Sequence, residues 1–451
     1  MMLKKISLAV MLLLFISNNI TAQVVEEEII EEEILDDGII EEEILEEEIL
    51  EEETLGEEVV SDEVFNEEIS SPKVSTISSG ISGNVRGDYR FYPKEALYPG
   101  QKEEYFSAVF NPEAYIEWDD GKQLIQFKGF GRLNQYDNEQ THWDVRELYY
   151  QYVFKKWEVS LGAKQIYWGF TESNHLANVI NQDDVLEGSD IENKLGQPML
   201  HLSFSPKWGV IDVMAMPYFR TMKFPGVNGR GRPPFEIGTQ ANYESNFEEY
   251  NPDLAIRWSH SIKSVDLGVS HFYGTSRIPL IVAETTSLQL PPTLSIYHEL
   301  INQTGLEFQL TTGAMLWKLE AINRFSKRKT IKAFTAGGEY TFSNVFKTDV
   351  GILVEYTYDD RGDESINGLN DDFFLGMRIA FNDKQSSDFL GGVNIDREKG
   401  TIMYFAEANR RLGDSWKVSV KALGFEEVSE TDFLYLIRND GYLEFSLAKY
   451  F

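Results

Sequence analysis

Apolar and polar residues alternate along many short segments of this chain. In the segment 348–358, Val350, Ile352 and Val354 alternate with polar or small residues, and the segment 416–422 repeats the pattern. Successive side chains of a strand face opposite sides, so each segment has one apolar and one polar face. The segments have about the length that a tilted strand needs to cross a bilayer, roughly 9 to 11 residues. A soluble β-sandwich alternates in the same way, so the pattern alone leaves both classes open.

Tryptophans lie beside several short turns between the alternating segments. The turns read DDGK, FKK, TTGAML and LGDS, and the tryptophans next to them are Trp118, Trp157, Trp317 and Trp416. Aromatic side chains gather in this way at the two interfaces of a membrane-spanning barrel. Their positions therefore favour a membrane barrel over a soluble sandwich.

The alternating segments predict an all-β fold, a transmembrane up-and-down antiparallel β-barrel. We expect 18 strands, with 16 as the alternative, at residues 80–92, 105–118, 123–136, 144–154, 157–169, 199–205, 209–220, 252–261, 264–274, 301–312, 316–325, 331–342, 348–358, 372–381, 387–396, 401–412, 416–425 and 441–451. An even number of strands places both ends of the barrel in the periplasm. The long connections, 170–198, 221–251 and 275–300, are candidates for folding into the lumen as a constriction.

The N-terminal residues are typical of a secretory signal peptide. Lys4 and Lys5 precede an apolar run over 7–16, and the residues before Gln23 suit cleavage, so we expect a signal peptide at 1–22. No later stretch reaches the roughly 18 consecutive apolar residues that a membrane-spanning helix needs. The chain has no cysteine, which excludes a cysteine-linked lipid anchor and a disulfide scaffold. Together these features predict location in the outer membrane of a Gram-negative cell.

An acidic repeat precedes the barrel, which we expect to span 76–451. Nine five-residue blocks run from Glu26 to Ser70 and hold 23 Asp and Glu without any Lys or Arg. Of the formal net charge of −33, this tract carries −23 and the signal peptide +2, so residues 71–451 carry −12. A period of five matches neither a helix nor a strand, and charge repulsion opposes compaction. We therefore expect a disordered periplasmic tail at 23–75, with a cation-binding or partner-binding segment as the alternative.

Four segments, taken together, carry a resemblance to a group of bacterial proteins. They are VRELYYQY at 145–152, LGAKQIYWG at 161–169, ANVINQDD at 177–184 and VMAMPYFRTMKFPGVNGRGR at 213–232. The combination resembles porin-like outer-membrane β-barrels of uncharacterised function from proteobacteria and Bacteroidota, which are akin in architecture to phosphate-selective porins. Gln182 stands where these proteins have proline, and Lys164 where arginine is common. The last strand resembles their closing strand, which implies that Phe451 is the assembly signal.

The polar face of the strands predicts which charged side chains point into the lumen. It contains eleven basic and twelve acidic residues, so the wall by itself favours neither sign of ion. Most of these charges are expected to form cross-strand salt bridges. The lumen-lining candidates are Arg86, Arg132, Lys164, Arg257, Arg324, Arg378, Glu113, Glu117 and Glu355.

The segment 220–236 differs because it has four cations and no acid before its last residue. Arg220, Lys223, Arg230 and Arg232 are accompanied by glycines and prolines that suit a fixed loop. If the loop enters the lumen, these pore candidates form an eyelet that attracts anions. The alternative is an exposed loop that binds the phosphates of lipopolysaccharide.

Catalysis has little support in the sequence. The six histidines lack metal-site spacing, and neither a G-x-S-x-G nor a Walker pattern occurs, so we expect no enzyme, catalytic residue, metal or cofactor. We expect a porin-like channel for diffusion of small solutes, with a possible preference for anions. The alternatives are a substrate-specific channel for hydrophobic or anionic compounds, gated by inward loops, and a closed structural or adhesin-like barrel. Expected partners are outer-membrane lipid, lipopolysaccharide, the barrel-assembly machinery and small solutes, but no nucleic acid, and the oligomeric state is left open.

Overall fold

The structure, a computed structural model, describes residues 77–188, 193–235, 237–284, 293–362 and 368–451. The expected signal peptide at 1–22 and the acidic tail at 23–75 lie outside the described residues. Within the described ranges, no helix is long and apolar enough to cross a membrane.

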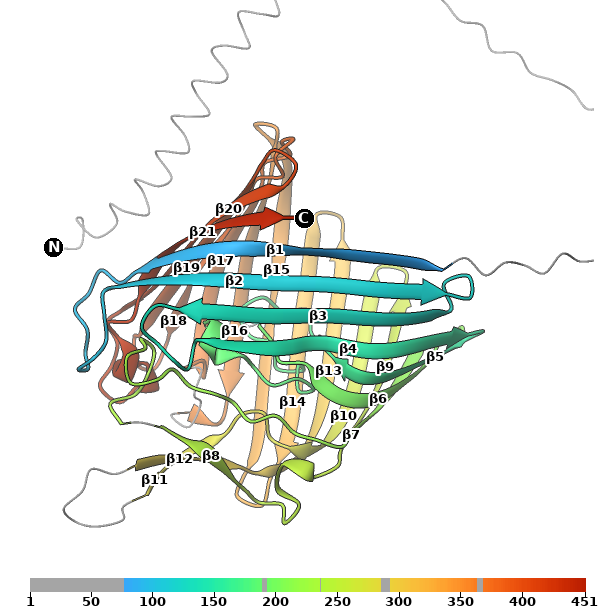
Figure 1. The fold of residues 1–451 in the computed structure, drawn as a ribbon, viewed down its shortest axis with the longest axis horizontal. Helices are drawn as coiled ribbons and strands as arrows, with labels where there is room; N and C mark the ends of the chain where they lie inside the picture. The colour runs from blue at the N-terminus through green and yellow to red at the C-terminus, as the bar shows by residue number, and fades with distance from the viewer. Residues whose placement is uncertain (1–76, 189–192, 236, 285–292, 363–367) are drawn as a thin grey trace, which may run out of the picture. The chain divides into compact units, whose positions relative to one another are not determined.

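Eighteen antiparallel strands form one closed barrel, in which each strand pairs with the barrel strands before and after it (Figure 1). They are β1 (Ser78–Phe91), β2 (Glu104–Trp118), β3 (Gln123–Asn134), β4 (His142–Phe154), β5 (Trp157–Lys164), β6 (Gln197–Phe204), β7 (Val210–Met216), β9 (Asp253–Ile262), β10 (Val265–Thr275), β13 (Leu300–Thr312), β14 (Met315–Phe325), β15 (Thr330–Val345), β16 (Thr348–Asp359), β17 (Asp371–Ala380), β18 (Asp388–Asp396), β19 (Ile402–Leu412), β20 (Trp416–Glu426) and β21 (Tyr442–Tyr450). The predicted all-β barrel of 18 strands is confirmed, with ends that differ by a few residues.

Strands β1 and β21 pair with each other and close the barrel. Beyond this pairing, Gly83 and Phe451 exchange two backbone hydrogen bonds, 3.2 Å from the Gly83 nitrogen to the Phe451 oxygen and 3.1 Å in the reverse direction. The Phe451 ring stacks on Phe110 with the ring centroids 6.3 Å apart. Because the sheet is closed, the barrel has no free strand edge that another chain could extend.

The apolar face of the strands points outward and the polar face points into the lumen. On β21, Phe445 and Leu447 are exposed on the outside, whereas Glu444 is buried inside. Exposed apolar side chains of this kind form the lipid-facing belt of a membrane barrel. The tryptophans expected at an interface lie beside the short turns, at or near the ends of β2, β5, β14 and β20.

One long connection between β5 and β6, described over 165–188 and 193–196, folds into the barrel, and we call it the inward loop. Its buried residues Trp168, Ala177 and Ile180 join apolar side chains of β6, β7, β9, β10 and β13 in one core cluster. This core fills one side of the lumen. The remaining space lies against the wall that β1, β3, β20 and β21 form. The inward loop corresponds to the first long connection that the sequence marks as a candidate constriction.

The other two long connections contain a small sheet that the sequence did not predict. It consists of β8 (Ile237–Tyr243), β11 (Leu280–Glu284) and β12 (Thr293–His298), with β12 antiparallel to β11 and parallel to β8. Figure 1 shows this sheet apart from the ring of barrel strands. Short 3-10 helices, η2 (Val185–Glu187), η3 (Glu248–Tyr250) and η5 (Phe433–Ile437), lie in the loops.

Candidate functional site

Two buried carboxylates of the barrel wall, one on β14 and one on β16, anchor the inward loop. The first is Glu320 on β14. Its carboxylate accepts hydrogen bonds from the backbone N–H groups of Phe170 (2.8 Å), Thr171 (3.0 Å) and Ala177 (2.9 Å). The Thr171 hydroxyl donates a fourth bond at 2.6 Å. At Gly169 the φ angle is 116°, and a Cβ there would lie 2.5 Å from the Glu320 Oε1 atom. Glycine therefore lets the backbone approach the carboxylate closely.

The second anchor is Glu355 on β16, which holds the next residues of the inward loop. Its carboxylate accepts bonds from the N–H groups of Glu172 (2.9 Å) and Ser173 (2.7 Å) and from the Ser173 hydroxyl (2.6 Å). Glu172 in turn pairs with Arg378 on β17 at 2.8 Å. Hydrogen bonds to an ionised carboxylate are roughly twice as strong as neutral ones, so the two glutamates hold the loop firmly across the lumen.

The tip of the inward loop reaches the opposite wall through two ion pairs. Arg132 on β3 donates two hydrogen bonds to Glu187, at 2.8 and 2.6 Å. Arg146 on β4 pairs with Asp184. Burial raises the pKa of Asp184, but the His142 imidazole 3.7 Å away and the Arg146 guanidinium outweigh it and hold that pKa below its usual value. The loop tip is therefore charged and fixed in place.

Arg146 faces the lumen because of an irregularity in the β3–β4 ladder. The register shifts between Lys128 and Gly129, which lie opposite Glu147 and Val145, so Arg146 is the extra residue. A bulge of this kind redirects a side chain that simple alternation would place on the other face. Sequence reasoning missed Arg146, although two adjacent charged residues in an alternating strand are a usable signal.

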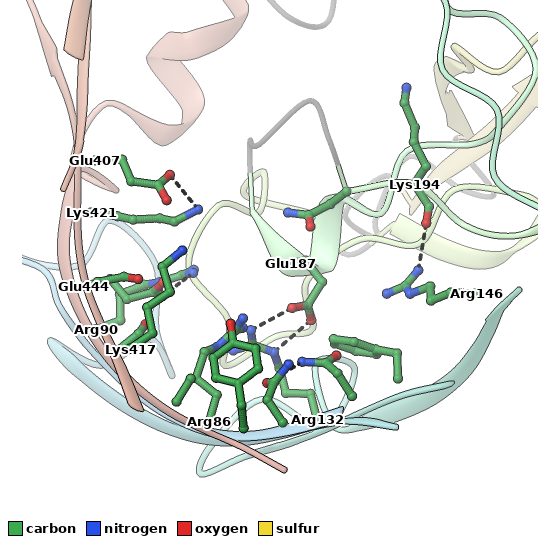
Figure 2. A pocket seen from close by; sticks show the side chains of 18 of the residues that line it. Arg86, Arg90, Arg132, Arg146, Glu187, Lys194, Glu407, Lys417, Lys421 and Glu444 are labelled. Atoms are coloured by element: carbon green, nitrogen blue, oxygen red, sulfur yellow. Dashed lines mark hydrogen bonds and ion pairs between the residues drawn. The ribbon is translucent and has the colours of Figure 1, made fainter. Parts of the chain in front are cut away.

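A cavity of about 380 Å³, the constriction cavity, lies between the loop tip and the barrel wall (Figure 2). Seven cations and three acids line it, namely Arg86, Arg90, Arg132, Arg146, Lys194, Lys417 and Lys421, with Glu187, Glu407 and Glu444. Figure 2 shows Glu187 reaching from the inward loop toward Arg132, while Lys417 and Lys421 extend from β20. Cations outnumber acids in the lining, although four aspartates outside it, Asp88, Asp144, Asp183 and Asp184, also pair with these cations.

The cations of the constriction cavity differ in how they are paired. Arg90 lies 2.6 Å from Glu444, and Lys421 lies 3.0 Å from Glu407. Within the part of the chain that the structure describes, Lys417 forms no ion pair and is only half-buried. Its ammonium group therefore contributes positive charge that no neighbouring carboxylate cancels.

Six of the nine lumen-lining candidates contact the inward loop or the cavities beside it, and Arg257 does so through Trp168. Arg86 and Arg132 line the constriction cavity, and Arg86 also pairs with an aspartate of its own strand at 2.8 Å. Arg378 and Glu355 hold the inward loop. Arg324 lines a second cavity, which is described below.

Arg257 lies against the first part of the inward loop, and the last three candidates lie elsewhere on the strands. Arg257 pairs with Glu307 at 2.5 Å and lies over the ring of Trp168, so it belongs to the wall that the core cluster covers. Lys164 pairs with Glu158 of its own strand at 3.3 Å. Glu113 and Glu117 lie on β2 toward its short turn.

The four cations of the segment 220–236 are placed in different environments. Arg220 pairs with an aspartate of β4 at 2.7 Å. Arg230 is buried, lies 3.4 Å from an aspartate of the loop after β20 and covers a tyrosine ring at 4.5 Å. Arg232 donates hydrogen bonds to backbone oxygens of its own loop and of the loop after β1. Lys223 is exposed. Three of the four thus make internal contacts.

The second cavity, of about 390 Å³, lies toward the long loops, and we call it the vestibule cavity. The inward loop, η5, the beginning of β19 and the end of β20 contribute to its lining. Much of this lining is apolar and includes Leu176, Val179, Leu186, Met403, Phe425, Phe433 and Leu434. Arg90, Lys194 and Tyr442 line both cavities, so the vestibule cavity adjoins the constriction cavity. Sequence reasoning missed this apolar space because its residues lie mainly in loops without periodicity.

One cluster brings a histidine and two carboxylates together. Ligand atoms of His142, Asp184 and Glu187 lie within 4.8 Å of one another. Both carboxylates already accept hydrogen bonds from the guanidinium groups of Arg146 and Arg132. Two adjacent positive charges oppose the binding of a further cation, so the cluster is built as an ion-pair network.

Comparisons with known proteins give likenesses among solved structures only. No family model matches the chain, and no curated protein matches it. OmpTΔL8, the loop L8 deletion mutant of OmpT, an outer membrane protein of Vibrio cholerae, is similar at 9% identity over 83% of this chain and 99% of its own, with a TM-score of 0.44. A triple mutant of the Rhodopseudomonas blastica porin is similar at 12% identity over 83% of this chain and 100% of its own, with a TM-score of 0.40. The strand order, closure and outward apolar belt of the chain itself give it a porin-like β-barrel architecture.

Proposed function

We propose that this chain is an outer-membrane channel through which small solutes diffuse, with a preference for anions that is set at the constriction cavity. The observation that carries the proposal is Lys417, which among the described residues is the one cation of this lining without an ion pair, since the other six pair with carboxylates. Rings of Arg and Lys favour anionic solutes in barrel pores. A low-dielectric wall also focuses the field of such charges and raises the local concentration of anions.

The inward loop supports the proposal because it narrows the lumen without filling it. Its anchors, Glu320 and Glu355, lie on one side, and its tip meets Arg132 on the other. A solute that moves along the barrel axis therefore passes between the loop tip and the basic wall of β1, β20 and β21. The eyelet that the sequence suggests for 220–236 has less support, because three of its four cations make internal contacts.

Replacing Lys417 by glutamine tests the proposal. The variant removes the cation that lacks an ion pair among the described residues, and it leaves no carboxylate without its partner. We expect the anion-to-cation permeability ratio to fall, and the effect to be largest at low salt, because screening at physiological ionic strength acts over about 8 Å. Reversal potentials in a salt gradient across a planar bilayer measure the ratio.

The matched control is Lys223→Gln, which removes one exposed positive charge from the segment 220–236. We expect this variant to keep the ratio of the unchanged protein. If Lys223→Gln lowers the permeability ratio as much as Lys417→Gln does, ion selection takes place at the segment 220–236. No change in Lys417→Gln would contradict selection at the constriction cavity.

A further inference from the structure

The vestibule cavity departs from what a passive pore requires. The interior of a water-filled barrel is polar, because water and ions must pass along it. Here Leu186, Met403, Phe425, Phe433 and Leu434 line one continuous space together with charged groups. They come from the inward loop, β19, β20 and η5, which are distant in sequence. Converging apolar side chains with a few polar groups among them are the usual lining of a small-molecule site, and the cavity has a suitable volume, about 390 Å³.

The cations of the vestibule cavity are paired with carboxylates, with one exception. Six Arg and Lys residues line it, and five of them form ion pairs: Arg90 with Glu444, Lys194 with Asp183, Arg230 with Asp440, Arg277 with Asp253 and Arg361 with Asp359. The sixth, Arg324 on β14, has no carboxylate within ion-pair distance among the residues that the structure describes. Only 7% of Arg324 is exposed.

The surroundings of Arg324 fix its position without neutralising it. Its Nε atom donates a hydrogen bond to the Gln303 side-chain oxygen at 2.7 Å, and the Gln303 amide donates to the Leu176 carbonyl of the inward loop at 3.3 Å. A neutral amide satisfies one of the five N–H donors of the guanidinium and supplies no charge. Asn174, also in the lining and buried, has an amide nitrogen for which the described residues provide no hydrogen-bond acceptor. The buried Arg324 guanidinium and the buried Asn174 amide can therefore both donate to an acceptor on a bound molecule.

We propose that the vestibule cavity is a binding site for a small amphipathic carboxylate, with an apolar body against the cavity lining and its carboxylate on Arg324. The planar guanidinium matches a carboxylate in a two-bond arrangement. One unpaired cation neutralises one negative charge, which favours a monoanion over a dianion in an apolar space. The adjoining constriction cavity, which shares Arg90 and Lys194 with the vestibule, then receives the solute. The inference rests on the proposed channel function only for the onward route, because binding can be measured without conduction.

The test compares three probes, octanoate, octanol and acetate, on the full-length protein in lipid nanodiscs. Detergent is avoided because its molecules are themselves amphipathic, and empty nanodiscs correct for partitioning into lipid. We expect calorimetry to show octanoate binding at least tenfold more tightly than either of the other probes. Acetate binding as tightly as octanoate, or octanoate binding no better than octanol, would overturn the inference.

Substitutions separate the contribution of the Arg324 guanidinium from that of the apolar lining of the vestibule cavity. Arg324→Gln should weaken octanoate binding by about tenfold or more and leave octanol unchanged, and Arg324→Lys should restore part of the loss. Phe433→Ser should weaken both octanoate and octanol. The matched control is Arg328→Gln just beyond β14, a partly exposed arginine that pairs with Glu299 at 3.3 Å, and it should bind as the unchanged protein does. Unaltered octanoate binding in Arg324→Gln would contradict the role of Arg324.

Two further measurements keep the outcomes distinct. Heat-modifiable gel mobility shows whether each variant has formed its barrel, and Arg324→Lys alone tests the arginine if Arg324→Gln fails this check. Planar-bilayer conductance of the same preparations separates this inference from the proposed channel function. A conducting barrel that ignores octanoate contradicts the inference alone, whereas a barrel that binds octanoate without conducting contradicts the channel alone.

Discussion

Replacing Glu320 by alanine should release the inward loop and widen the pore. The change removes an acceptor of four hydrogen bonds and leaves the N–H groups of Phe170, Thr171 and Ala177 without their partner. Each hydrogen bond to a charged group contributes about 1.5–3 kcal/mol. The bonds are not additive, and breaking a buried charged network typically costs roughly 3–5 kcal/mol. The detached state of the loop should therefore become on the order of a hundredfold to several thousandfold more populated.

Single-channel recording in planar bilayers measures this effect directly. The Glu320→Ala variant should show larger and noisier conductance steps, because the loop no longer keeps to one position in the lumen. Limited proteolysis should also cut within 165–196 faster than in the unchanged protein. The barrel itself should still show heat-modifiable mobility, since the strand ladders do not depend on this carboxylate.

The matched control is Glu339→Ala on β15. Glu339 is another carboxylate inside the barrel, 3.8 Å from Lys318 and 3.9 Å from Arg378, and no hydrogen bond joins it to the described residues of the inward loop. We expect this control to change conductance much less than Glu320→Ala does. Unchanged conductance together with unchanged proteolysis in Glu320→Ala would refute the view that this carboxylate holds the loop in the pore.

Three further predictions concern the membrane face, the small sheet and the closing strand. Val420→Arg should lower the stability of the folded barrel by roughly 2–4 kcal/mol, because it places a charge on the lipid face near mid-membrane. Ser419→Arg on the lumen face should be tolerated. Equal yields of folded barrel in a gel-shift assay would refute the assigned faces. Burial lowers the pKa of His298 to about 4, so the folded small sheet keeps this histidine neutral while the unfolded chain protonates near 6.5. The sheet should lose stability as pH falls from about 6.5 toward 4, and hydrogen exchange should show this loss in the unchanged protein but not in His298→Gln. Deleting Phe451 removes both hydrogen bonds to Gly83 and should lower the yield of folded barrel, and a normal yield would contradict a role in closure.

The strands could be predicted from the sequence because a period of two is a local signal. Each strand buries one face and exposes the other, so segments such as 348–358 reveal both their length and their facing. The bulge beside Gly129 breaks this rule for Arg146, since one extra residue changes the face of those that follow. The small sheet was missed for a different reason: strands as short as Leu280–Glu284 are too brief to show alternation.

For the constriction cavity, the sequence predicts the individual lining residues but not how they come together. Arg86, Arg132 and Lys417 follow from the polar parity of their strands, but their shared cavity depends on where the inward loop folds. The polar parity of their strands also places Glu320 and Glu355 inside the barrel, where most charges were expected to pair with cations across strands. The structure instead shows their carboxylates satisfied by backbone N–H groups of a loop more than a hundred residues earlier in the chain. No local pattern reports such a contact.

The reversal potential of the unchanged protein in a tenfold gradient of potassium chloride tests the central claim most directly. A channel with a basic constriction should pass discrete current steps and give a potential of the sign that chloride selectivity requires. That selectivity should weaken as salt rises, because screening shortens the reach of the cavity charges. A barrel without conductance, or one whose potential has the sign of potassium selectivity, would contradict the proposed function.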